Sequence, residues 1–335
     1  TDYFEICIRP QGSGKEASIT GNDFIDGEVG VWVDGDATTM VTAQYNTIDI
    51  TTGGFVYGVQ NVSATAMVDA TCNWWTTTDA YAIDAKVDGN VQFLPYSTLA
   101  SPMNCEGVGP VTVWDGSHTT LQSSHMTIQD GIDAAVAGEI VDVEGGIYNE
   151  AITVAHKGIE LHGTGVAPNP TIIDGTGITG TGIPGDPLVY FVETDDATND
   201  MWMHGFTLAN IEGNFGFRAF MIQNNGTLKI TDNNIVLDAS NKRAFYASTC
   251  NPTGNIIFNN NTISGGGISS LILIERAEGP CEIGFNTINL SEGGSAIYSM
   301  SYADGSGDHN VTGEHWYHDN IISAAGTGGY GITIA

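Results

Sequence analysis

The sequence predicts an all-β solenoid, a fold in which short strands stack into successive coils. Gly accounts for 44 of the 335 residues and is spread, with Thr, Asn and Ser, between short β-branched runs, which indicates many brief strands and tight turns. A second observation is a recurring pattern of a short strand followed by Asn-x-Ile. Clear copies begin at Asn46, Asn233, Asn261 and Asn286, and looser ones fall at Asn22, Asn73, Phe206 and Asp319.

The spacing of these copies predicts coils of about 24–28 residues, with one longer interval of 33 residues from 286 to 319. Alternation within a copy, as at Ile48 and Ile50, places apolar side chains on one face of a strand. One coil cannot bury that face alone, whereas stacked coils bury a continuous apolar column. Asn suits the corner because it tolerates left-handed backbone angles and can donate hydrogen bonds along the stack. We therefore expect an Asn ladder.

Two segments differ from the repeat. Residues 127–138 begin with Thr-x-x-Asp, carry apolar residues at helical spacing and reach Gly138, which predicts a short capping helix near 127–137 over the first coil. Residues 73–96 combine Asn73-Trp74-Trp75 with a run ending at Pro95-Tyr96, an aromatic closure for the other end of an apolar column.

These runs resemble the right-handed parallel β-helix proteins of the pectate-lyase-like superfamily, and especially its large repetitive secreted and surface members. The similar stretches are Ile128 to Tyr148 at the start of a helix and Asn73 to Pro95 at its close. The resemblance implies a right-handed parallel β-helix. It leaves the activity open, because one fold hosts many functions.

The aromatic closure at residues 73–96 comes before the capping helix at 127–138 in the chain, and this order determines the expected domains. Residues 1–98 are the final coils and closing cap of one β-helix, 99–123 a linker, and 124–335 the capping helix and first coils of a second β-helix. Exposed coil ends are unpaired apolar edges, so we expect the unit to join copies of itself head to tail. The alternative is a fragment of a longer chain.

Charge excludes several classes of partner. With 39 acidic and 9 basic residues the net charge is −30, which repels nucleic acid and anionic membranes. The sequence also contains no run of about 18 apolar residues, the length that a membrane-spanning helix needs. The five cysteines include no CxxC pair, which favours disulfides over a zinc site. Disulfides in turn favour an extracellular or cell-surface location. Cys72 with Cys105, and Cys250 with Cys281, are the expected pairs.

The sequence predicts no catalytic residue and no certain cofactor. Calcium is the metal considered, with Asp34 and Asp36 in one loop and Asp304 and Asp308 in another as candidate ligands, although solvated acidic turns have the same composition. A carboxylate pair for glycoside hydrolysis would come from Asp174 with its neighbours, or from Asp200 with Glu193, Asp195 and Asp196.

The functional expectation is an extracellular structural protein, not an enzyme, that polymerises with itself into a filament, sheath or surface coat. The alternative is a secreted carbohydrate-active enzyme (polysaccharide lyase or hydrolase) or a sugar-binding adhesin on the same fold. This second class should show converging Asp and Glu beside a basic or aromatic platform.

Overall fold

The computed structural model describes residues 6–8, 16–34, 40–52, 54–100, 103–164, 169–192, 199–222, 226–238, 242–250, 253–266, 270–291, 294–300, 314–324 and 330–334. The chain forms two compact units, residues 1–110 with 124–126 and residues 111–123 with 127–335. The candidate calcium ligands Asp36, Asp304 and Asp308 lie outside the described residues.

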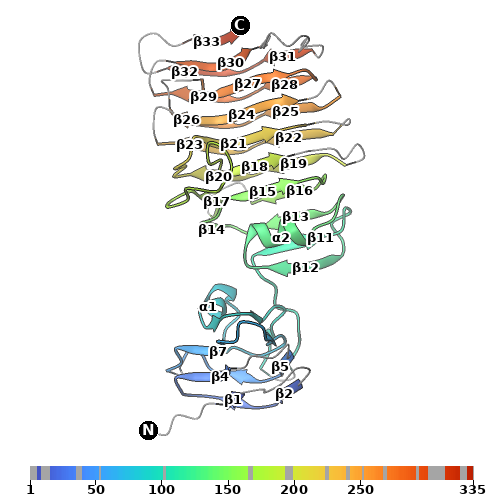
Figure 1. Ribbon diagram of the computed structural model, residues 1–335, viewed down its shortest axis with the longest axis vertical. Helices are drawn as coiled ribbons and strands as arrows, with labels where there is room; N and C mark the ends of the chain where they lie inside the picture. The colour runs from blue at the N-terminus through green and yellow to red at the C-terminus, as the bar shows by residue number, and fades with distance from the viewer. Residues whose placement is uncertain are drawn as a thin grey trace. The chain divides into compact units, whose positions relative to one another are not determined.

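Three long sheets form the second unit, and successive coils add one strand to each of them (Figure 1). We call them sheets I, II and III. Sheet I contains, in order, β12 (Leu121–His125), β11 (Val111–Trp114), β13 (Ile140–Val143), β16 (Glu160–Gly163), β19 (Met201–His204), β22 (Thr227–Thr231), β25 (Asn255–Asn259), β28 (Cys281–Gly284) and β31 (His315–His318). Sheet II contains β14 (Gly146–Tyr148), β17 (Thr171–Asp174), β20 (Phe206–Ala209), β23 (Asn234–Leu237), β26 (Thr262–Gly265), β29 (Thr287–Leu290) and β32 (Ile321–Ala324). Sheet III contains β15 (Ile152–Ala155), β18 (Val189–Val192), β21 (Phe215–Phe220), β24 (Arg243–Cys250), β27 (Ile272–Ala277), β30 (Ser295–Met300) and β33 (Tyr330–Ile334).

Register explains how this unit is held together. From β13 onward neighbouring strands are parallel, and Leu161, Met203 and Ile230 follow one another in one buried column of sheet I. Each strand alternates buried and more exposed residues, so every coil adds one apolar layer. The predicted all-β fold of the parallel β-helix type is confirmed.

The first unit has the same construction on a smaller scale. Its sheets contain β1 (Ile6–Ile8), β4 (Val29–Val33), β7 (Tyr57–Asn61) and β9 (Val87–Asp88); β10 (Val91–Gln92), β8 (Met67–Asp69), β5 (Met40–Gln44) and β2 (Glu16–Thr20); and β3 (Asp23–Phe24) with β6 (Thr47–Ile48). The aromatic closing run contributes to its core, since Trp75 is fully buried and Phe93 and Tyr96 nearly so. Helix α1 (Ala80–Asp84), which the sequence analysis missed, begins where the Asp79 carboxylate accepts from the backbone N–H of Tyr81 and Ala82.

The expected Asn ladders are present in both units. In the first unit Asn22, Asn46 and Asn73 bond in sequence, at spacings of 24 and 27 residues. In the second unit Asn233, Asn261, Asn286 and Asn320 do the same, at spacings of 28, 25 and 34 residues. The last spacing shows that the ladder residue is Asn320, and the choice of Asp319 was wrong by one residue.

The left-handed residue of each corner is the one before the ladder Asn. Tyr45, Asp232, Asn260, Phe285 and Asp319 have φ of 55°, 58°, 58°, 57° and 51°. The ladder Asn is therefore selected for its amide, which bonds to neighbouring coils, and the expectation that it adopts the left-handed angle itself was wrong.

Helix α2 (Ile128–Ala134) confirms the predicted capping helix. The Thr127 hydroxyl accepts from the backbone N–H of Asp130, as in an N-cap. Helix α2 lies beside strands β11 and β13 (Figure 1). Its Ile128 and Ile132 are buried in the core of the first coils. The Glu150 carboxylate accepts from the first-turn N–H groups, and the Lys157 ammonium donates to last-turn carbonyls, so each charge faces the helix end that favours it.

Part of the expected linker is structured. Val111–Trp114, within residues 99–123, and Leu121–His125, which overlaps the end of that range, form strands β11 and β12 of sheet I. Val111 and Val113 are buried, and β11 pairs antiparallel with β13. The alternation Val-Thr-Val-Trp explains this difference, because it supplies one apolar face to the sheet.

Candidate functional site

Three of the four candidate calcium ligands, Asp36, Asp304 and Asp308, lie outside the described residues. Asp34, a partly exposed residue after β4, is the only one of the four that is described. Across the described residues, no group of three or more His, Cys, Asp or Glu side chains is arranged to hold a metal ion. Calcium binding at these loops stays a prediction.

The carboxylates considered for glycoside hydrolysis have structural partners. Asp174 accepts from the backbone N–H and the hydroxyl of Thr176, at 2.9 and 2.7 Å, and from the Asn210 amide. These bonds, the Thr176 hydroxyl first, lower the Asp174 pKa, so the group stays an anion that holds a turn. Asp200 forms an ion pair with Lys229, and residues 193–198 lie outside the described residues.

The outward face of sheet I carries two columns of residues, most of them polar or aromatic, with one residue from every strand of the sheet except β12. The first column is Trp114, Ile140, Glu160, Trp202, Lys229, Ile257, Glu282 and Trp316. The second is Thr112, Asp142, His162, His204, Thr231, Asn259, Gly284 and His318. Parallel strands lie about 4.8 Å apart, so neighbours within a column are in contact range.

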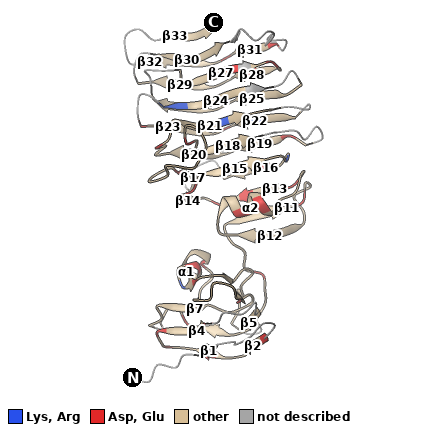
Figure 2. Ribbon diagram, viewed as in Figure 1, with Lys and Arg blue, Asp and Glu red and all other residues tan. Residues whose placement is uncertain are grey.

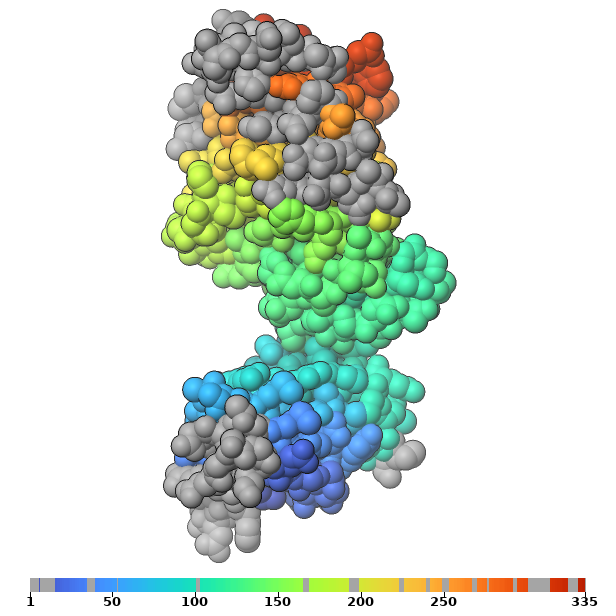
Figure 3. All heavy atoms as spheres, turned by 45° about the vertical axis from the view of Figure 1, so that its right-hand side comes forward, coloured from blue at the N-terminus to red at the C-terminus, as the bar shows by residue number. Residues whose placement is uncertain are grey.

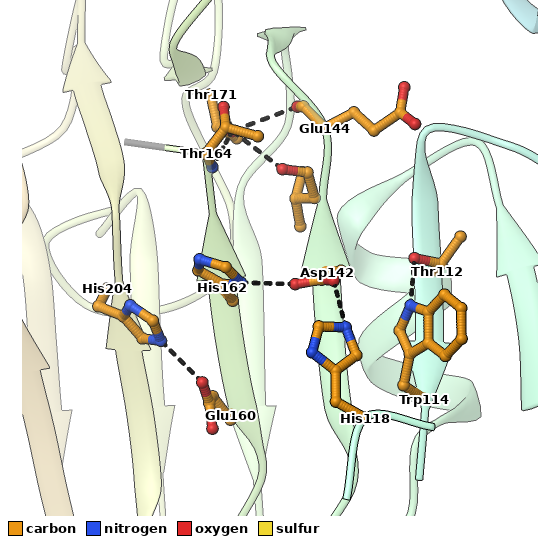
Figure 4. A network of polar contacts seen from close by, with 11 residues as sticks. Thr112, Trp114, His118, Asp142, Glu144, Glu160, His162, Thr164, Thr171 and His204 are labelled. Atoms are coloured by element: carbon orange, nitrogen blue, oxygen red, sulfur yellow. Dashed lines mark hydrogen bonds and ion pairs between the residues drawn. The ribbon is translucent and has the colours of Figure 1, made fainter. Parts of the chain in front are cut away.

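Histidines and carboxylates of the two columns, together with His118 from the loop between β11 and β12, form a series of polar contacts (Figure 4). The two oxygens of Asp142 lie 2.6 Å from His118 Nε2 and 2.7 Å from His162 Nδ1. One coil further on, His204 Nε2 lies 2.9 Å from a carboxylate oxygen of Glu160. Each of the three imidazoles thus has a carboxylate partner that fixes its ring orientation.

The rings of this face are stacked as well. His204 lies between His162 and Trp202, with ring centroids 4.7 and 4.2 Å away and interplanar angles of 17° and 23°. The Trp202 Nε1 donates to the Thr231 hydroxyl at 2.9 Å. Trp202 is therefore held by the hydrogen bond to Thr231 and by stacking of one face of its ring on His204.

Next to Trp202 an open pocket of about 370 Å³ lies where the chain turns into strands β13, β16 and β19. Gly138 and Gly158 line it with backbone, and a Cβ at Gly158 would lie 2.0 Å from the Asn199 carbonyl oxygen. Its side-chain lining includes Glu139, Glu160, Asn199, Asp200, Trp202 and Lys229. The pocket therefore joins an aromatic ring to hydrogen-bonding groups.

Comparison with known proteins gives no further assignment. No protein-family model matches the chain, and no curated protein or solved structure is detectably similar to it. The site must be judged on its own geometry.

A cluster of a different kind lies on the outward face of sheet III. The Arg218 guanidinium is 5.6 to 5.8 Å from the ring centroids of Tyr190, Phe220 and Tyr246. The Tyr246 hydroxyl bonds to Glu275, and burial is the main cause of the raised Tyr246 pKa. Arg218 and Arg243 are among the few basic residues of the second unit (Figure 2), and both are used within the protein by aromatic contacts.

The coil formed by β31, β32 and β33 is open on one side. These strands are the outermost members of sheets I, II and III, and Figure 3 shows the red residues of this coil at the end of the second unit's stack. Ile332 follows Ile297 in register, yet 43 % of its surface is exposed, whereas Ile297 is fully buried. Among the described residues, none packs over the core column on the outer side of this coil. No helix in the described part of the chain has the length and apolar character needed to cross a membrane.

Sequence reasoning missed the sheet I site. Residues 118, 142, 162 and 204 are separated by unequal intervals, so no local motif marks them. They meet because each coil returns the chain to the same column, including a long coil between β16 and β19. A usable signal was the outward His or Trp beside an inward Leu or Met in β16 and β19.

Proposed function

We propose that this chain is an extracellular structural protein whose β-helix units join head to tail into a filament, sheath or surface coat. The observation that carries the proposal is the uncovered core column at β31–β33. Tyr317, Ile322 and Ile332 are the core-facing residues of that coil, in register with the buried Ile283, Ile288 and Ile297. At the other end of the same column helix α2 covers the core.

An uncovered coil of this kind favours a partner with parallel strands. Its three strand edges present a row of backbone N–H and C=O groups beside apolar side chains, including Ile334, which is 74 % exposed. The first unit of a second copy offers three outer strands, β1, β2 and β3, from its own stacked sheets. Coil-on-coil pairing of copies repeats one heterologous contact, which builds a filament when it does not close into a ring.

One further observation supports the extracellular part of the proposal. Cys72 and Cys105 form a disulfide across 33 residues, as the sequence predicted. Disulfides persist in oxidising compartments outside the cytosol. The proposal also places the chain with the large repetitive members of the pectate-lyase-like superfamily, on the strength of the runs at 73–95 and 128–148.

Sedimentation velocity tests the proposal. Wild-type protein should form larger species as its concentration rises. Ile332→Asp should weaken this association, because it places a charge on the uncovered core column. Val236→Asp is the matched control, since Val236 is 39 % exposed on β23 in the middle of sheet II, away from any open coil. Equal association of the two variants, or a wild-type monomer at every concentration, would refute the proposal.

A further inference from the structure

The two Asn ladders have the same polarity. At every step the backbone N–H and the side-chain amide of one ladder Asn donate to the Oδ1 of the Asn in the following coil, at 2.8 to 3.2 Å. The steps lead from Asn22 to Asn46 and Asn73 in the first unit, and from Asn233 to Asn261, Asn286 and Asn320 in the second. Each ladder therefore has an acceptor end at its first Asn and a donor end at its last.

The acceptor end of the first ladder and the donor end of the second are both open. Within the described residues the Asn22 Oδ1 accepts no hydrogen bond, although the Asn22 N–H groups donate to Asn46. The Asn320 Oδ1 accepts from Asn286, and the Asn320 amide donates to the Ile283 carbonyl. The backbone N–H of Asn320, however, has no acceptor in the described part of the chain. One unit thus presents free donors and the other a free acceptor.

We infer that these two ends meet where copies join, so that Asn320 of one copy donates its backbone N–H and its amide to the Asn22 Oδ1 of the next. This inference rests on the filament proposal and deepens it, because it names the contact between the copies and fixes their register. A further bond follows from the same pattern. At each step the residue after a ladder Asn donates its N–H to the carbonyl of the previous ladder Asn, as Ile321 does to Asn286. Across the junction Asp23 should donate to Asn320 in the same way.

The same alignment joins the two core columns. Tyr317 and Ile19 lie three residues before their ladder Asn. Ile322 and Phe24 lie two residues after it. All four occupy core positions, because Ile19 and Phe24 are buried and the other two pack against the core of the second unit. A slip of one residue would break the ladder and turn these side chains away from the core, so hydrogen bonding and apolar packing select one register.

Sheet III has room for one strand where the copies meet. In the chain β4 follows β2 and β3, so with β2 on β31 and β3 on β32 it would lie on β33. The place beside β4 is held by β1 in the free protein. Strand β33 has five residues and β1 three, so we expect β33 to pair with β4 and β1 to be displaced. Ile6→Asp, which loosens β1 from the core of the first unit, should therefore strengthen association.

Cysteine crosslinking tests the register. Ser18 and Trp316 are exposed and lie four residues before their ladder Asn. The junction should bring their Cα atoms to about 4.8 Å, within the range of a disulfide. A mixture of Trp316→Cys and Ser18→Cys should form a covalent dimer under mild oxidation, at a yield above that of either variant alone. Trp316→Cys mixed with Thr20→Cys is the matched control, because the exposed Thr20 is two residues out of register and beyond disulfide reach.

Asn22→Ala gives an independent readout. This variant removes the acceptor of two bonds at the junction and should raise the dissociation constant for association, measured by sedimentation velocity, on the order of tenfold. Asn149→Ala is the control, because the Asn149 amide donates to turn carbonyls of the second unit and belongs to neither ladder. Thermal melting of each variant separates lost association from lost folding, and crosslinking decides the matter if Asn22→Ala does not fold.

The outcomes distinguish this inference from the filament proposal. A wild-type protein that stays monomeric at every concentration would overturn both. If the wild type associates, equal dissociation constants for Asn22→Ala and Asn149→Ala would overturn the Asn junction alone. So would a dimer yield from Trp316→Cys with Ser18→Cys that does not exceed the yield with Thr20→Cys. Weaker association in Ile6→Asp would overturn the displacement of β1.

Discussion

The Oδ1 of Asn286 accepts both the backbone N–H and the side-chain amide of Asn261 in the preceding coil, at 2.9 and 3.2 Å. The Asn286 amide in turn donates to the Phe258 carbonyl at 2.9 Å. Asn286 is fully buried, so none of these groups has water as an alternative partner. The ladder therefore satisfies polar backbone that the corner would otherwise bury without a bond.

Asn286→Ala should destabilise the second unit by about 3 kcal/mol, because it leaves several buried polar groups of the neighbouring coils without a partner. Asn320→Ala removes the outermost, partly exposed member of the same ladder and should cost less, about 1 kcal/mol. Calorimetric melting of both variants measures the difference. Equal losses of stability in the two variants would show that burial does not determine how much each ladder Asn contributes to stability.

Phe285 occupies the left-handed corner position with φ of 57° and is 53 % exposed. Phe285→Gly and Phe285→Ala both remove the ring contact with His318. Gly should nevertheless be more stable than Ala by about 1 kcal/mol, the reverse of their usual order in a strand, because only Gly adopts this angle without steric cost. Urea titration of the pair is the measurement, and a more stable Ala variant would contradict this account of the corner.

Burial raises the pKa of Glu150 above its ordinary value of 4.5, and outweighs the two backbone bonds from Ile128 and Gln129 that lower it. The folded state then binds the Glu150 proton more tightly than the unfolded state does. This contribution to stability is complete below about pH 4.5 and is lost as the pH rises through the folded-state value. Glu150→Gln should accordingly flatten the decline in melting temperature of the second unit above that pH.

The pKa of Asp174 is shifted in the opposite direction to that of Glu150, so Asp174 serves as the comparison. Its pKa is lowered from 3.8, chiefly by the Thr176 hydroxyl, so its contribution is present above that pH and is lost as the pH falls through the folded-state value. Asp174→Asn should change only the acid limb of the melting profile. If Glu150→Gln and Asp174→Asn both changed the acid side of the melting profile, the raised folded-state pKa of Glu150 would be contradicted.

The disulfide between Cys72 and Cys105 closes a segment of 33 residues within the first unit. Cys105→Ser should lower the stability of that unit by about 2–4 kcal/mol, mainly because the unfolded chain gains freedom. Melting with and without dithiothreitol measures the effect, and the reductant should not change the melting of the first unit in Cys105→Ser. An unchanged melting temperature of the first unit after reduction of the wild-type protein would contradict this prediction. The pairing of Cys250 with Cys281 stays a prediction, since the side chain of Cys250 lies outside the described residues.

Features with a local or periodic signature were predictable from sequence. The in-phase Asn and Ile at Asn233, Asn261 and Asn286 gave the stack and its ladder, and Thr127 with Asp130 gave the start of α2. Helix α1 was missed because it has only five residues, too few to show helical spacing of apolar side chains.

The candidate site was not predictable in the same way. Asp142, His162 and His204 meet through register across coils of unequal length, and that register is fixed by core packing, not by spacing in the sequence. The calcium prediction depended on loop composition alone, which does not determine whether carboxylates converge.

Electron microscopy of concentrated wild-type protein tests the central proposal most directly. The account predicts filaments in which strands continue across the junction between copies at a spacing of about 4.8 Å, with β31–β33 inside the junction. Isolated particles at every concentration, or filaments whose junctions leave β31–β33 exposed to solvent, would contradict it.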